Sequence, residues 1–239
     1  MITAKLNGGL GNQMFQIAAA YSLAIDNGDT CAFDLSAPVV KQGNSAITYK
    51  DNIFKNINVL PDGWKPRTVY KELSSSYSEI QYSEGMQLMG YFQSDKYFKH
   101  NKKAIIDLFS IDLSPIDVLG IHVRRGDYFG VSECKPLDME YYNSSIHYLD
   151  ERIVINRILV FSDDISWCRD NMNDKRMEFI SGTDYEDFIM FYSCRYKTIA
   201  NSSFSGMASI LSGSDIIIAP QEWGEEISPD VYTKEMMIL

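Results

Sequence analysis

Short apolar segments of strand length alternate with helical segments along residues 116–239. The predicted strands are 118–123, 157–161, 178–180, 198–200 and 215–219, and the predicted helices are 138–151, 165–171, 185–195 and 205–211. Alternation of this kind indicates an α/β fold with a parallel sheet covered by helices on both faces. Such sheets bind ligands at the carboxyl ends of their strands, so the loops that follow the strands are the first candidates for a site.

The N-terminal part of the chain is less regular. The expected elements are strands at 2–6, 30–35 and 87–91 and helices at 15–24 and 96–109, with loops and short helices over 36–85. Proline and small polar residues at 114–117 interrupt both the strand and the helix pattern. We therefore expect two domains, 1–115 and 116–239.

Composition excludes several classes of protein. With 239 residues, 45% of them hydrophobic, and a net charge of -10, the chain can bury a large core but lacks the basic surface that nucleic acid requires. The four cysteines form no Cys-x-x-Cys pair and no zinc spacing, which favours a reduced, cytoplasmic protein. Signal-peptide and membrane-spanning patterns are absent from the sequence. A peripheral membrane contact or a homo-oligomer is left open.

The segment His122-Val123-Arg124-Arg125-Gly126-Asp127-Tyr128 carries an imidazole, two guanidinium groups and a carboxylate at the end of a predicted strand. Guanidinium groups bind phosphate oxygens through paired, charge-assisted hydrogen bonds. A diphosphate-bearing ligand is therefore the first hypothesis. The alternative is a solvated turn with a surface ion pair, which contributes little.

Three further segments lie where a strand ends and a helix begins. The glycine-rich turn 8–13 either lets a ligand approach the backbone or only makes a tight turn. Asp163 and Asp164 could bind a divalent metal or accept hydrogen bonds from a guanine edge, or Asp163 could cap the next helix. The segment 201–205 offers a second phosphate cradle, although capping alone would also explain its serines.

Together these segments resemble the alpha-1,2-fucosyltransferases of glycosyltransferase family 11. The matching segments occur in chain order and are 8–16, 90–98, 122–128, 161–164, 201–205 and 216–220. The resemblance implies a GT-B-like α/β fold with two Rossmann-like lobes and a donor site in the cleft, the first lobe on the acceptor side and the second binding GDP-fucose. It further implies transfer of L-fucose from GDP-fucose to the 2-hydroxyl of a terminal galactose in a glycan, with inversion and without a metal or other cofactor.

The resemblance also assigns roles to individual residues. Arg124 would contact the GDP phosphates, with His122 supporting the same loop, and Asp163 or Asp164 would recognise guanine or ribose. Donor binding is further expected at Gly9, Gly11, Asn12, Gln13, Ser202, Ser203 and Phe204. Inversion requires a base for the acceptor hydroxyl, and Asp127 and Glu133 are the carboxylates nearest to the arginines in sequence.

The chain departs from the family pattern at Gly206 and Met207, where family members usually carry two tryptophans, and it is shorter than expected. Either an apolar wall near the acceptor is missing, or both positions face the core and only packing changes. Two other functions remain as alternatives: a GDP-sugar or glycan-binding module without turnover, and a transferase that uses a different donor or acceptor.

Overall fold

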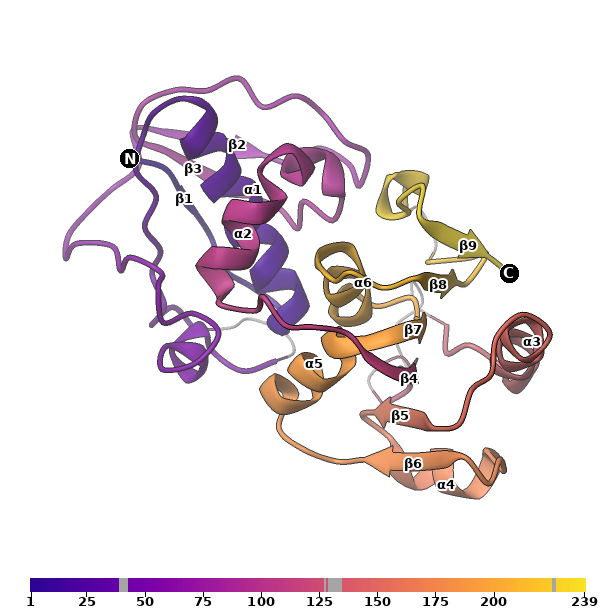
Figure 1. Ribbon diagram of the computed structural model, residues 1–239. Coiled ribbons are helices and arrows are strands. Elements are labelled where there is room, and N and C mark those ends of the chain that lie inside the picture. The colour runs from indigo at the N-terminus through magenta and orange to yellow at the C-terminus, as the bar shows by residue number, and fades with distance from the viewer. Residues whose placement is uncertain (39–42, 127, 129–134, 225–226) are drawn as a thin grey trace. The chain divides into compact units, whose positions relative to one another are not determined.

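A computed structural model gives the structure of residues 1–38, 43–126, 128, 135–224 and 227–239. The chain forms two compact units. The first contains Met1–Asp112 and Ser228–Val231, and the second contains Leu113–Ile227 and Tyr232–Leu239 (Figure 1). Each unit has its own parallel sheet.

The second unit is built on a six-stranded parallel sheet in the order β6-β5-β4-β7-β8-β9. Its strands are β4 (Ile116–Val123), β5 (Ile158–Ser162), β6 (Met177–Ile180), β7 (Cys194–Thr198), β8 (Ile216–Ala219) and β9 (Met236–Ile238). The chain runs outward from β4 to β6, then returns to place β7 on the other side of β4. The carboxyl ends of β4 and β7 therefore flank the point where the strand order reverses, which is where open sheets bind ligands.

Helices cover both faces of this sheet. On one face are α3 (Met139–Asp150) and α4 (Ile165–Asn171), and on the other are α5 (Asp184–Ser193) and α6 (Ser203–Leu211) (Figure 1). The alternation of side chains along β4 sends Leu119, Ile121 and Val123 into the core under α3 and α4. Gly120 and His122 face the opposite helices, where a β-carbon on Gly120 would come within 2.8 Å of Cys194 Sγ.

The first unit contains the parallel sheet β1-β3-β2, made of β1 (Thr3–Ala4), β3 (Met86–Met89) and β2 (Thr68–Lys71). Two isolated parallel bridges, Ile2 to Cys31 and Phe33 to Val59, continue the pairing beyond β1. The long helix α1 (Leu10–Asp26) and the shorter α2 (Lys102–Phe109) pack in this unit. The apolar face of α1 is buried, as its sequence predicts.

The predicted elements differ from the structure in several places. The predicted helix 96–109 begins only at Lys102, because Phe98 adopts a φ of -146° between two short 3₁₀ turns. The predicted strand 198–200 is wrong, since β7 occupies Cys194–Thr198 and α5 ends before it, at Ser193. Sequence patterns also missed β2 and β9, which are short strands with exposed or mixed side chains.

The division into units departs from the predicted boundary in one respect. Ser228–Val231 joins the first unit although it follows the second in sequence. Asp230 forms an ion pair of 2.5 Å with Lys96 and accepts a hydrogen bond of 2.7 Å from the Tyr77 N–H, and the Ser228 N–H donates to Ser75 Oγ at 2.8 Å. These polar contacts explain why a late segment packs with early residues.

Candidate functional site

Side chains from three loops of the second unit meet at the carboxyl end of its sheet. His122 is the penultimate residue of β4, Asp163 follows β5, and Ser202 precedes α6 after β7. The parallel registers pair His122 with Phe161 and Ile121 with Thr198, so these three strands end at one level. The structure thus brings together the predicted residues from 122–126, 163–164 and 201–205.

Asp163 holds the loop that carries the arginines. Its Oδ1 accepts a hydrogen bond of 2.9 Å from the Arg125 N–H, and its Oδ2 accepts one of 3.0 Å from the Gly126 N–H. Arg124 Nη1 lies 3.2 Å from the same Oδ2. Both oxygens of Asp163 therefore bind the protein itself, and its carboxylate fixes the position of the Arg124 guanidinium.

The two neighbouring arginines differ in their surroundings. The Arg125 guanidinium lies 3.6 Å from the centre of the Trp167 ring, and its Nε lies 3.7 Å from Asp164, so it packs on α4. The Arg124 side chain keeps 29% of its surface exposed beside the sheet end. Arg124 is therefore the better candidate to bind an anionic ligand.

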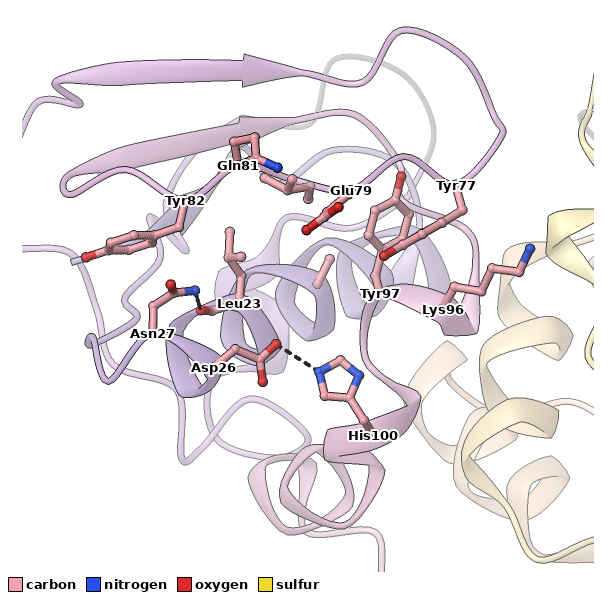
Figure 2. A pocket seen from close by; sticks show the side chains of 12 residues that line it. Leu23, Asp26, Asn27, Tyr77, Glu79, Gln81, Tyr82, Lys96, Tyr97 and His100 are labelled. Carbon is pink, nitrogen blue, oxygen red and sulfur yellow. Dashed lines mark hydrogen bonds and ion pairs between the residues drawn. The ribbon is translucent and has the colours of Figure 1, made fainter.

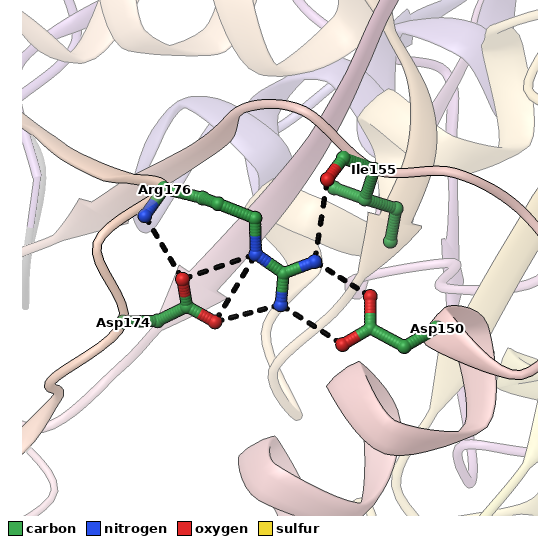
Figure 3. A network of polar contacts seen from close by, with 4 residues as sticks. All are labelled: Asp150, Ile155, Asp174 and Arg176. Atoms are coloured by element: carbon green, nitrogen blue, oxygen red, sulfur yellow. Dashed lines mark hydrogen bonds and ion pairs between the residues drawn. The ribbon is translucent and has the colours of Figure 1, made fainter.

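Arg176 shows what a purely structural arginine looks like in this unit. Its five N–H donors are directed at Asp150, Asp174 and the Ile155 carbonyl, at distances from 2.6 to 3.3 Å (Figure 3). Hydrogen bonds to both carboxylates raise the pKa of Arg176. This network fastens the end of α3 to the turn before β6 and leaves no N–H for a ligand.

His122 is buried and supports the site through its contacts with α6. Its Nδ1 lies 3.0 Å from Ser205 Oγ in α6, and its ring packs 5.0 Å from that of Phe204. Burial, with the nearby charge of Arg124, lowers the pKa of His122 to about 3, so the ring is neutral at ordinary pH. A proton assigned to Nδ1 lets the ring donate to Ser205, whose hydroxyl can donate to the Ala200 carbonyl at 3.2 Å. His122 is therefore a positioning group.

The start of α6 is the second anion-binding element. Ser202 precedes the helix in an extended conformation, and its side chain makes no capping hydrogen bond with the described residues. The first N–H groups of a helix have no acceptor within the helix, and the helix dipole favours an anion there. The Tyr128 hydroxyl donates a hydrogen bond of 2.6 Å to the Asn201 carbonyl, which links this loop to the arginine loop. Sequence reasoning missed this link, although both residues lie in the quoted motifs.

Of three further predicted residues, the structure describes only Asp164. Asp164 is the N-cap of α4, where its Oδ1 accepts a hydrogen bond of 3.1 Å from the Trp167 N–H. The sequence predicted this capping role for Asp163 as one alternative, and the structure gives it to the next residue instead. Asp127 and Glu133, the two candidates for the base, lie outside the described residues.

The glycine-rich turn of the first unit is packed by the chain itself. A β-carbon on Gly43 would come within 2.5 Å of Gly9 Cα, so the two backbones touch. The buried Gln13 donates hydrogen bonds of 2.8 Å to the Gly8 and Asn44 carbonyls. Gly11 is buried within α1, and Asn12 accepts a hydrogen bond of 2.6 Å from Gln93. These contacts agree with the tight-turn alternative, and donor binding by these residues stays a prediction.

The departure at Gly206 and Met207 concerns packing. Met207 is fully buried. A β-carbon on Gly206 would lie 3.2 Å from the Trp223 ring, so this ring fills the space beside the glycine. Trp223 in turn packs edge-on against Tyr232, with ring centres 5.7 Å apart. The core alternative therefore holds, and an aromatic ring reaches this place from a later part of the chain.

Metal and thiol chemistry find little support in the described part of the chain. No group of three or more histidine, cysteine or carboxylate side chains there has the geometry of a metal site. Cys31, Cys168 and Cys194 are buried free thiols. None of the helices over these residues has both the length and the apolar character needed to cross a membrane.

The chain is similar in sequence to known glycosyltransferases. The family profile described as Glycosyl transferase family 11 matches residues 1–235. The chain is 30% identical to an alpha-1,2-colitosyltransferase of Escherichia coli, over 94% of this chain and 93% of the relative. It is 25% identical to the galactoside 2-alpha-L-fucosyltransferase SEC1 of Bos taurus, over 91% of this chain and 66% of the relative.

A crystal structure of the NodZ alpha-1,6-fucosyltransferase soaked with GDP-fucose has a similar fold. Its TM-score is 0.52 at 13% sequence identity, with 92% of this chain and 94% of that chain covered. This likeness, with the parallel sheets, confirms the expected α/β fold of the GT-B-like type.

Proposed function

Since this chain belongs to glycosyl transferase family 11, we propose that it moves L-fucose from GDP-β-L-fucose to the 2-hydroxyl of a terminal galactose in a glycan. Among its relatives is a galactoside 2-alpha-L-fucosyltransferase. In this proposal the second unit binds the donor and the first unit recognises the acceptor.

The observation that carries the proposal is that Arg124 and the start of α6 follow β4 and β7, the two strands that flank the point where the strand order reverses. Breaking the bond between fucose and phosphate leaves negative charge on the departing GDP. A guanidinium held by Asp163 and a helix N-terminus can stabilise that charge without reorganising. The neutral His122 would keep the start of α6 in place during this step.

Inversion and metal independence are parts of the same proposal. A carboxylate must accept the proton of the galactose hydroxyl as the new bond forms, and Asp127 and Glu133 are the candidates. Arg124 and the helix N-terminus would then do the work that a divalent cation does in other transferases. Activity that survives EDTA would support this, and a loss that Mg²⁺ or Mn²⁺ reverses would contradict it.

A second donor is favoured by one finding. A relative with 30% identity over nearly the whole chain is an alpha-1,2-colitosyltransferase. Colitose differs from fucose by lacking one ring hydroxyl, so the two donors are separated by whether the site hydrogen-bonds that hydroxyl. A site built to bind a hydroxyl rejects an analogue without it by a large factor.

The experiment that tests the proposal is a transfer assay with each donor. GDP-fucose and GDP-colitose are offered separately with N-acetyllactosamine, and the linkage in the product is determined by NMR. Fucose on O2 of galactose supports the first proposal, and exclusive transfer of colitose supports the second. Tight GDP binding without any transfer would identify a binding module instead.

A further inference from the structure

A pocket of about 480 Å³ lies in the first unit, between the C-terminal half of α1 and the extended segment 77–82 (Figure 2). Its volume falls in the range of roughly 300–1,000 Å³ that is typical of small-molecule sites. The loops discussed so far do not line it. It faces residues 19–26 of α1, which lie roughly 15–25 Å along the helix from Gly9.

The outer wall of the pocket is fixed at both ends. At one end the Tyr77 N–H donates to Asp230 at 2.7 Å, and the Ser78 N–H donates to the Tyr97 hydroxyl at 3.2 Å. At the other end the Tyr82 hydroxyl donates to Asp29 at 3.2 Å. The segment between these anchors is therefore held away from α1, so the hollow is a built feature of the fold.

Two polar side chains of this wall have no internal role. Glu79 and Gln81 are exposed and form no hydrogen bond or ion pair with the residues that the structure describes. Figure 2 shows the Glu79 carboxyl group directed into the space above Leu23. On the opposite wall the Asp26 carboxylate is paired with His100 at 2.8 Å. The unpaired groups are therefore available to a ligand.

The lining has the chemistry that a sugar requires. Hydroxyl groups of a sugar both donate and accept, and the pocket offers a carboxylate acceptor on Glu79 and an amide on Gln81 that does both. Tyr77 and Tyr82 are each 38% exposed and present ring surface on which the C–H face of a sugar can rest. The carboxylates of Glu79 and Asp26 disfavour an anionic ligand, and the ammonium group of Lys96 is paired with Asp230 at 2.5 Å.

We propose that this pocket binds a sugar unit of the acceptor glycan beyond the terminal disaccharide that carries the modified galactose. This inference rests on the proposed function, because that function supplies the acceptor. The pocket would then make the enzyme prefer long acceptors over short ones.

The test compares two acceptors that end in the same disaccharide, N-acetyllactosamine and lacto-N-neotetraose. The variant is Glu79→Ala with Gln81→Ala, and the control is Asp62→Ala, an exposed carboxylate of the same unit outside the pocket. We expect the double variant to raise KM for the tetrasaccharide roughly tenfold, with KM for the disaccharide and for the donor unchanged. The control should match the wild type.

Calorimetric titration with lacto-N-neotetraose separates this inference from the proposed function. If no donor is turned over, weaker binding by the double variant than by the control still supports a sugar site. An equal rise in KM for both acceptors would overturn the inference. Unchanged KM values together with unchanged binding of the tetrasaccharide would also overturn it. Weaker binding with an unchanged KM would overturn the acceptor assignment, and binding of tetramethylammonium in place of the sugar would overturn the ligand class.

Discussion

His122 Nδ1 lies 3.0 Å from Ser205 Oγ, and this contact joins the end of β4 to the first turn of α6. The residues on either side of it, Arg124 and Ser202–Phe204, are the groups proposed to hold the donor diphosphate. The buried pair therefore sets the distance between a guanidinium and a helix N-terminus. Both members are uncharged, so the pair costs less to bury than an ion pair would.

Arg124→Ala should lower kcat/KM about a hundredfold, or roughly 3 kcal/mol, because it removes a charge that stabilises the departing diphosphate. Arg124→Lys should also be poor, since an ammonium group lacks the planar pair of donors. The control is Arg169→Ala, which removes an exposed guanidinium of the same unit. Steady-state kinetics at several donor concentrations measure the effect, and normal activity of soluble Arg124→Ala would contradict the role.

Asp163→Asn should reduce activity about tenfold or more, because an amide nitrogen cannot accept one of the two backbone N–H groups that the carboxylate binds. Asp164→Asn is the matched control. Asparagine caps helices about as well as aspartate, so its thermal stability and its kinetics should stay near those of the wild type. If Asp164→Asn instead loses donor affinity at unchanged stability, Asp164 contacts the donor after all.

His122→Asn should change how stability depends on pH. The pKa of His122 is lowered to about 3 in the folded chain, against about 6.5 when unfolded, so unfolding takes up a proton between these values. The wild type should therefore lose stability, relative to the variant, as pH falls from about 6.5 toward 3. Urea titrations at several pH values measure this difference, and parallel curves for the two proteins would refute it.

Lys197→Met tests a buried amine on β7. Lys197 is fully buried, and burial lowers its pKa to about 7 although its Nζ contacts the Tyr192 and Cys194 carbonyls. The unfolded chain then binds the extra proton between about pH 7 and 10.4, so wild-type stability should rise relative to the variant over that range. If the difference in the free energy of unfolding between the wild type and Lys197→Met does not vary with pH, the surrounding oxygens keep the ammonium group charged.

Gly206→Trp restores a family residue and should destabilise this protein by about 1–3 kcal/mol, because the Trp223 ring already fills the space. Adding Trp223→Ala should recover part of the loss. The control is Gly213→Trp, where the nearest atom to an added β-carbon is Pro115 Cγ at 4.0 Å. Thermal melts of the single and double variants measure the loss of stability. A lower acceptor KM at unchanged stability would instead favour a pocket wall at this position.

Much of the second unit could be predicted because its strands and helices bury regular apolar patterns. The strand that ends at Val123 and the helix that begins at Ser203 were found within one or two residues. β7 was misplaced because Arg195 and Lys197 resemble exposed residues in sequence. Lys197 is nevertheless buried, since carbonyl and hydroxyl oxygens brought together by folding surround its amine.

The sequence by itself determined the fold class and the family motifs, and it indicated Arg124 as the leading candidate to bind an anion, because these depend on local periodicity and on residue type next to a strand end. Only the tertiary structure decided which side chains contact other parts of the protein and are therefore not available to a ligand. It directed Asp163 to the arginine loop, Asp164 to a helix cap, Arg125 to Trp167 and Trp223 to Gly206. Each of these partners is distant in sequence or satisfies a backbone group, and neither relation leaves a periodic pattern in the chain.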